Sequence, residues 1–221
     1  MEKLLQLIHT IIDLIFPHTC VGCKKTGQLL CDACENSLLM TPIFVSENIT
    51  ALFPYHHGII KKLLWQLKYK QSAEVANILA PYLADILLEN SADKLALNLK
   101  AEPIILIPAP MSRLRKRERG FNQASKLAQA LARLHPNIFV VDETIVKKIK
   151  ETKPQVTCRT RTERLNNVKN AFEAHLPNGM HHHHFIIIDD VSTTGATLDE
   201  IIKALRKTAA ENISAAVIAH G

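Results

Sequence analysis

Two acidic residues follow an apolar run close to the C-terminal end of the sequence. In FIIIDDVSTTGAT, residues 185–197, four apolar residues precede Asp189 and Asp190. Such a run fits a strand buried on both faces, and open α/β sheets bind ligands at the carboxyl ends of their strands. Because consecutive strand residues point to opposite sides, one acid can reach a sugar diol or a magnesium shell while the other organises the loop.

The segment STTGAT comes next, and its composition is typical of a loop that binds an anion. Gly195 can adopt a positive φ, which lets the backbone approach a ligand closely. The main-chain N–H groups of such a loop, followed by a helix N-terminus, favour a phosphate, and Thr193, Thr194 and Thr197 add hydroxyl donors. We therefore predict a ribose-phosphate site. The alternative is an ordinary strand–loop–helix turn with a threonine cap and solvated acids.

The usual nucleotide-binding motifs do not occur in this sequence. It has seven glycines, and none falls into G-x-x-x-x-G-K-[ST] or G-x-G-x-x-G. A P-loop ATPase and a dinucleotide-binding Rossmann enzyme are therefore disfavoured.

Four of the five cysteines form two pairs near the start of the chain. CVGCKKTGQLLCDAC has the spacing C-x₂-C, seven residues, C-x₂-C, which suits tetrahedral binding of one zinc ion. Four protein ligands leave no open position, so this zinc would be structural; the predicted ligands are Cys20, Cys23, Cys31 and Cys34. Two disulfides or buried free thiols are the alternatives, and the lack of an export signal disfavours disulfides. For Cys158, the fifth cysteine, we expect an ordinary exposed thiol.

Two segments concentrate the positive charge. The formal net charge is +6, while residues 111–120 carry a net +4 and residues 147–170 a net +6. This distribution predicts a polyanionic or phosphate-rich partner, and two solvated loops are the alternative. The basic residues could track a nucleic-acid backbone or neutralise the pyrophosphate of a sugar donor. The first group is Arg113, Arg115, Lys116, Arg117 and Arg119, and the residues expected to face it are Lys147, Lys148, Arg159, Arg161 and Arg164.

Aromatic residues make up 5% of the chain, so rings for base stacking are scarce. Trp65, Tyr69 and Phe121 are candidates, but a core position or a domain contact is the favoured interpretation of each. The run of four histidines at 181–184 makes a poor single metal site, because successive side chains of an extended segment point apart. We expect a loop there.

Apolar strands alternate with amphipathic helices in the second half of the chain, which predicts an α/β fold with a parallel sheet. The expected strands are 104–110, 138–149, 170–175, 185–189 and 213–220; the expected helices are 59–69, 75–87 (despite Pro81), 122–134 and 197–207.

Three regions follow from this pattern. They are an N-terminal helix and zinc module (1–40), a helical connecting region (41–100) and the α/β domain (101–221). The N-terminal helix, with Leu4, Ile8, Ile11 and Ile15 at helical spacing, is expected to dock on the protein. No apolar run of about 18 residues occurs, so we expect no transmembrane segment and a cytoplasmic protein.

The segment IIIDDVSTTGAT resembles the phosphoribosyl pyrophosphate signature of type I phosphoribosyltransferases. The resemblance implies that Asp189 and Asp190 hold the ribose hydroxyls, with magnesium accompanying the ligand. It also implies that IPAPMS, residues 107–112, forms a pyrophosphate loop and that the stretch around Arg159–Arg164 is a mobile catalytic loop. The 5′-phosphate would be cradled by Thr193, Thr194, Gly195, Ala196 and Thr197.

Paired cysteines upstream of this signature resemble the ComF family of bacterial proteins, which is linked to DNA uptake in natural competence. The matching segments are CVGCKKTGQLLCDAC, LKYK, IPAPMSRLRKRERGFNQA, RTRTERLNNVKNAF and IIIDDVSTTGAT. The resemblance implies a cytoplasmic protein that handles incoming single-stranded DNA, with a competence helicase or another DNA-processing protein as a possible partner.

Three functions remain open at this point. The first is a protein that handles single-stranded DNA on a phosphoribosyltransferase scaffold and binds phosphoribosyl pyrophosphate, and we favour it. The second is an active phosphoribosyltransferase that releases pyrophosphate. The third is a regulator that senses phosphoribosyl pyrophosphate through an inactive site. A fold alone does not decide among them.

Overall fold

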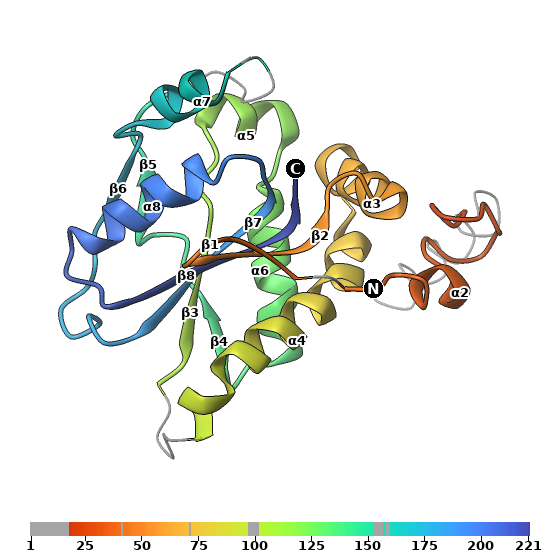
Figure 1. Ribbon diagram of the computed structural model, residues 1–221, viewed down its shortest axis with the longest axis horizontal. Helices are drawn as coiled ribbons and strands as arrows, with labels where there is room; N and C mark the ends of the chain where they lie inside the picture. The colour runs from red at the N-terminus through yellow and green to blue at the C-terminus, as the bar shows by residue number, and fades with distance from the viewer. Residues whose placement is uncertain (1–17, 41, 71, 97–101, 153–156, 158–159) are drawn as a thin grey trace, which may run out of the picture.

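The computed structural model describes residues 18–40, 42–70, 72–96, 102–152, 157 and 160–221 (Figure 1). The predicted N-terminal helix, Cys158 and Arg159 lie outside these residues. No helix in the described ranges is long and apolar enough to cross a membrane.

A six-stranded sheet with the order β1-β2-β8-β7-β3-β4 forms the centre of the molecule. All neighbouring strands run parallel except β1 and β2, which form an antiparallel hairpin. The predicted α/β fold with a mainly parallel sheet is therefore confirmed. The strands are β1 (Ile43–Ser46), β2 (Ile49–Pro54), β3 (Ile104–Pro108), β4 (Phe139–Val141), β7 (His184–Ser192) and β8 (Asn212–His220).

Helices cover both faces of this sheet, and β7 shows why. Ile186 and Ile188 belong to one apolar layer, whereas Phe185 and Ile187 belong to the other, because strand side chains alternate between faces. The first layer contains α3 (Gly58–Tyr69), α4 (Ala73–Ala96) and α6 (Gln123–Leu134), and the second contains α8 (Ala196–Arg206).

The cysteine-rich module packs against the first layer. Val21 and Leu29 are buried in the same apolar cluster as the inward residues of α3. The Lys62 ammonium of α3 donates a hydrogen bond to the main-chain oxygen of Val21 at 2.8 Å. The module, which contains the short helix α2 (Asp32–Glu35), is therefore attached to the side of α3, as Figure 1 shows.

Several elements differ from the sequence-based expectation. Residues 41–100 are not helical throughout, because β1 and β2 lie within them and β2 pairs with β8. The strand expected over 138–149 is two strands in different sheets: β4 joins the main sheet, and β5 (Val146–Lys148) pairs with β6 (Phe172–Ala174). The basic segments contain two helices, α5 (Arg113–Arg119) and α7 (Arg161–Val168). Figure 1 shows both helices at the end of the molecule that carries the β7–α8 loop.

Candidate functional site

The acidic pair lies within β7, and α3 contributes a cation to it. Asp190 is 4% exposed, and the Lys68 Nζ atom lies 2.9 Å from its Oδ2 atom. Its Oδ1 atom accepts a hydrogen bond from the N–H of Val191 at 2.9 Å. Burial acts to lower the pKa of Lys68, but the charge of Asp190, the hydrogen bond to it and the charge of Asp189 together outweigh burial and raise that pKa. Sequence reasoning missed Lys68, for which the segment LKYK was the only signal.

Asp189 is less enclosed than Asp190 and makes only a local contact. Its Oδ1 atom accepts a hydrogen bond from the N–H of Asp190 at 2.8 Å. Burial and the neighbouring charge of Asp190 raise the pKa of Asp189 to about 8, while the charge of Lys68 acts in the opposite direction. Asp189 is therefore the member of the pair with the less occupied carboxyl group, and a divalent cation or a diol would favour its ionised form.

The loop after β7 turns directly into α8. Gly195 has a φ of 76°, in the left-handed region, and stands at the N-cap of α8. A Cβ atom there would come no closer than 3.5 Å to its neighbours, so the backbone angle rather than space favours glycine. Within the described part of the chain, the N–H groups of Thr194 and Gly195 donate to no protein atom. Ser192 at the end of β7 is buried.

Basic side chains from two other elements lie in the same electrostatic neighbourhood. Burial and the charge of Arg115 lower the pKa of Lys148 to about 8, while the charges of Glu151 and Asp189 act to raise it. The Lys148 ammonium also donates a hydrogen bond to Thr152 Oγ1 at 2.7 Å. Lys148 of β5 is therefore close enough to Arg115 of α5 and to Asp189 for both charges to shift its pKa.

The remaining basic residues of the prediction are distributed more widely. Lys116 and Arg117 are exposed on α5, and Lys147 is exposed on β5. Arg161, in the first turn of α7, is close enough to lower the pKa of Asp199 in α8, which burial raises. Arg164 lies one turn further along α7. Lys148 is thus close to Asp189 and Arg115 is close to Lys148, whereas Arg161 and Arg164 lie on α7.

Of the two interpretations favoured for Trp65 and Tyr69, the core position is wrong. Trp65 is 54% exposed and Tyr69 is 60% exposed, both on the outer side of α3. The inner side of the same helix already carries four buried aliphatic residues, so no room in the core remains for the rings. Phe121 is half-buried, with the Lys126 ammonium 4.7 Å from its ring centroid.

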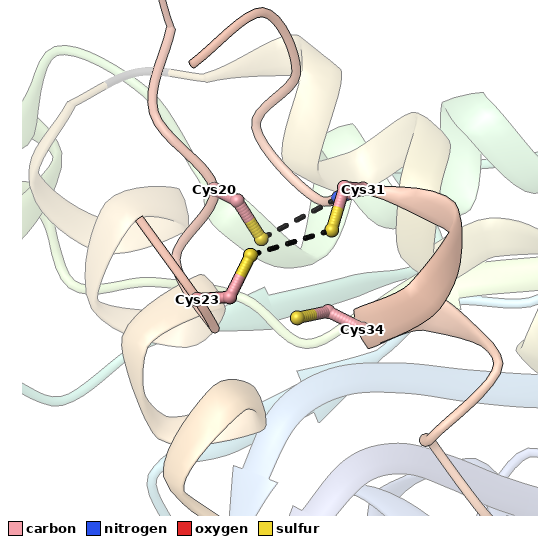
Figure 2. Close-up of side chains that lie close together, drawn as sticks. All are labelled: Cys20, Cys23, Cys31 and Cys34. Carbon is pink, nitrogen blue, oxygen red and sulfur yellow. Dashed lines mark hydrogen bonds between the residues drawn. The ribbon is translucent and has the colours of Figure 1, made fainter. Parts of the chain in front are cut away.

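The four paired cysteines converge as their spacing predicts (Figure 2). Their sulfur atoms all lie within 4.8 Å of one another, and the Cys23 and Cys31 sulfurs are 3.6 Å apart. Tetrahedral ligands at about 2.3 Å from zinc would be about 3.8 Å apart, so this arrangement fits the ion. None of the four forms a disulfide. The Sγ of Cys20 accepts a hydrogen bond from the Cys31 N–H at 3.5 Å.

The chemistry of these thiols also suits a metal. Burial opposes ionisation of Cys20, but main-chain N–H groups outweigh it and lower the pKa of that thiol to about 6. Burial and the neighbouring sulfurs raise the pKa of Cys34 to about 12. The four thiols therefore resist ionising together unless a cation compensates their charge. Gly22 lets the two pairs approach, because a Cβ there would meet the Cys34 Sγ at 2.5 Å.

The four consecutive histidines do not converge. His181 contacts the main-chain oxygen of Thr208, His182 contacts Glu211, His183 contacts Glu102 and His184 contacts Ser214. Among the described residues, the four cysteines are the only group of three or more potential ligands close enough to share a metal ion.

Two surface cavities lie away from the β7–α8 loop. One, of about 460 Å³, is lined mainly by α8 and the segment before β6, and the other, of about 350 Å³, lies at the amino ends of β7 and β8. Neither of these two cavities includes Asp189, Asp190 or Gly195.

Comparisons with known proteins agree with this geometry. The Phosphoribosyl transferase domain family matches residues 117–221, which contain the acidic pair and the loop. Competence protein F of Haemophilus influenzae is 32% identical over 201 residues, covering 90% of this chain and 82% of that protein. Competence protein ComFC of Bacillus subtilis is 28% identical over 203 residues, covering 89% and 75%.

Two further proteins are similar over a shorter part of the chain or at lower sequence identity. DNA utilization protein YhgH of Escherichia coli (strain K12) is 34% identical over 152 residues, covering 68% of this chain and 63% of that protein. Among solved structures, adenine phosphoribosyl transferase from Trypanosoma brucei has a TM-score of 0.43 at 15% identity, covering 82% of this chain and 75% of that one. The fold and the family match define a protein with a phosphoribosyltransferase domain. The chain belongs to the ComF family of competence proteins.

Replacing Lys68 by methionine should destabilise the protein by about 3 kcal/mol, because the buried carboxylate of Asp190 loses its partner. Adding Asp190→Asn to Lys68→Met should recover much of that loss, as chemical denaturation will measure. The exposed Lys61 of the same helix provides the control, and Lys61→Met should change stability by less than about 0.5 kcal/mol. Equal effects of Lys61→Met and Lys68→Met would argue against the ion pair.

The purified protein should contain one zinc ion per chain, and removing it should lower the melting temperature, because metal binding supplies on the order of 10 kcal/mol to such a module. Elemental analysis and thermal denaturation with a chelator check this. Cys31→Ser should lose the zinc, whereas Cys158→Ser, which removes the one cysteine outside the two pairs, should retain it. A metal-free protein with an unchanged melting temperature would contradict the assignment.

Proposed function

We propose that this ComF-family protein binds phosphoribosyl pyrophosphate with magnesium at the β7–α8 loop and handles single-stranded DNA during natural transformation. The observation that carries the sugar-phosphate part is the acidic pair of β7, placed directly before a loop whose Thr194 and Gly195 N–H groups have no protein acceptor in the described chain. Carboxylates suit a diol or a hydrated cation, and free amides at a helix start suit a phosphate.

Each part of the site has a distinct role in this proposal. Asp189 contacts the ribose hydroxyls or the magnesium shell, while Lys68 neutralises Asp190 and fixes its orientation. The loop from Thr193 to Thr197 holds the 5′-phosphate. Lys148 and Arg115 supply positive charge for the pyrophosphate, next to the segment IPAPMS at the end of β3.

The DNA-handling part rests on charge and on the names of relatives. The helix α5 contains five Lys or Arg residues and one Glu, and three of its basic residues, Arg113, Lys116 and Arg117, are exposed. Relatives are named competence proteins and DNA utilization proteins. An exposed basic helix at the same end of the molecule as the loop suits the backbone of a nucleic-acid strand. We assign the zinc that we predict at the four cysteines a structural role only, because all four positions of a tetrahedral ion would be filled.

An active phosphoribosyltransferase is the second candidate. The observation that favours it is Lys148, which lies close to both Asp189 and Arg115, since positive charge there would stabilise the departing pyrophosphate. In that reaction the bond from ribose C1 to the pyrophosphate oxygen breaks with its electrons on the oxygen. A nucleophilic nitrogen of the acceptor bonds to C1 and gives up its proton. Release of pyrophosphate on addition of a nucleobase would select this candidate.

Binding of magnesium phosphoribosyl pyrophosphate should be strongest near pH 8 and fall on both sides. Below that pH Asp189 takes up a proton, and above it Lys148 loses one, so each change removes a charge that the ligand needs. Calorimetry between pH 7 and 9.5 measures this, in a range where the phosphates, with a pKa of about 6, stay ionised.

Variants separate the two arms of that profile. Asp189→Asn should weaken binding about ten- to hundredfold and abolish the acidic arm, while Lys148→Met should abolish the alkaline arm. The control is Asp85→Asn, on the outer side of α4, which should bind as the wild type does. Wild-type affinity in the double variant Asp189→Ala/Asp190→Ala would sink the site assignment.

Single-stranded DNA binding should weaken steeply with salt, and neutralising α5 should reduce that dependence. Each lost phosphate contact lowers the slope of log affinity against log salt by about 0.7, so Lys116→Gln/Arg117→Gln should lower it by about 1.4. The matched control is Lys169→Gln/Lys207→Gln, two lysines by the cavity along α8. Equal losses in both pairs, measured by fluorescence anisotropy, would mean that net charge alone matters.

A further inference from the structure

The outer side of α3 carries two large aromatic rings that the fold does not use. Trp65 and Tyr69 are one helical turn apart, and their ring centroids lie 5.6 Å from each other with an interplanar angle of 43°. Both rings are more than half exposed. The buried side of α3 is complete without them, because it already consists of Ile60, Leu63, Leu64 and Leu67. An exposed aromatic pair of this kind marks a contact surface.

Two basic side chains lie close to these rings. The Arg119 guanidinium of α5 lies 5.4 Å from the centroid of the Tyr69 ring, and the Lys70 ammonium lies 6.0 Å from that of Trp65. Gln123 Oε1 accepts a hydrogen bond from Arg119 Nη1 at 3.1 Å and so fixes the position of the guanidinium. Residues 58–70 contain four lysines and no acidic residue. Lys70 and Arg119 therefore place positive charge beside the two rings, whereas Lys62 and Lys68 bind Val21 and Asp190.

This combination selects one kind of occupant. Aromatic rings interleaved with positive charge suit unpaired bases attached to a phosphate backbone. A free nucleobase would need an enclosed site that covers most of its surface, whereas Trp65 and Tyr69 are both more than half exposed. The bases of a duplex are already stacked and would not reach them. A protein partner would find a ring pair flanked by the cations of Lys70 and Arg119, which favours an acidic surface.

We infer that Trp65, Tyr69 and Arg119 form a base-stacking platform for single-stranded nucleic acid. The inference rests on the proposed DNA-handling function and adds to it the surface that contacts the bases, whereas α5 contacts the backbone. The platform consists of two residues of α3 and one of α5. Its residue Tyr69 directly follows Lys68, which pairs with Asp190. A strand that follows α5 would thus pass the platform beside the candidate phosphate site.

The chain has a single tryptophan, Trp65, so its own fluorescence reports on the platform. Titration with an oligo-dT strand should quench that fluorescence, whereas an abasic strand of equal length should bind more weakly and leave it unchanged. Because stacking on one ring contributes about 1–3 kcal/mol per base, Trp65→Ala/Tyr69→Ala should lower the affinity for oligo-dT at least about tenfold. The same variant should not change the affinity for the abasic strand.

Two further variants make the result specific. Trp65→Phe/Tyr69→Phe keeps both rings and should keep most of the affinity. Phe44→Ala removes a ring that is 74% exposed on β1 and should have no effect. The melting temperature of every variant should match the wild type, since none of these side chains is buried.

The outcomes separate this inference from the function on which it rests. Wild-type protein that binds oligo-dT without quenching, together with unchanged affinity in Trp65→Ala/Tyr69→Ala, overturns the platform and assigns the rings to a protein contact. That result would leave the DNA-binding function intact. Failure of the wild type to bind any single strand overturns both, while calorimetry of phosphoribosyl pyrophosphate still tests the phosphate site.

Discussion

Two adjacent carboxyl groups in a strand buried on both faces need compensation for their charge, and the rest of the structure follows from how they obtain it. Lys68 supplies the compensation from α3, at 2.9 Å from Asp190. Because Lys68 occupies Asp190, the carboxyl group of Asp189 is the less occupied of the two, and its pKa is raised. In the function that we propose, the ion pair thus makes Asp190 a positioning residue and leaves Asp189 to bind the ligand.

The helix α3 connects parts of the chain that have no other obvious relation. Its inner side packs in the first apolar layer, Lys62 binds the cysteine module through Val21, and Lys68 binds Asp190. Its outer side carries Trp65 and Tyr69. A structural metal in the cysteine module would therefore support the position of α3, and through α3 the acidic pair, although about 100 residues or more separate the lysines from β7 in sequence. The cysteine module would in this way contribute to the structure of the α/β domain.

Local patterns were enough to predict several elements and fell short at others. The apolar run before Asp189 predicted β7, and helical spacing predicted α3, α4 through Pro81, α6 and α8. The hairpin β1–β2 gave no comparable signal, because β2 becomes buried only by pairing with the distant β8. The segment 138–149 read as one strand, since its period does not reveal that the chain turns at Asp142–Thr144 into a second sheet.

For the site, the sequence by itself determined the residues whose chemistry is local: the acidic pair, the glycine at φ 76° that opens α8, and the cysteines, whose spacing already sets their convergence. The tertiary structure decided which cations accompany them. Lys68 and Lys148 come from elements far along the chain, and only packing brings them to the same carboxyl groups. It also decided that Trp65 and Tyr69 face outward. A ring at helical spacing is compatible with either side of a helix, and the side is fixed only when the other residues fill the core.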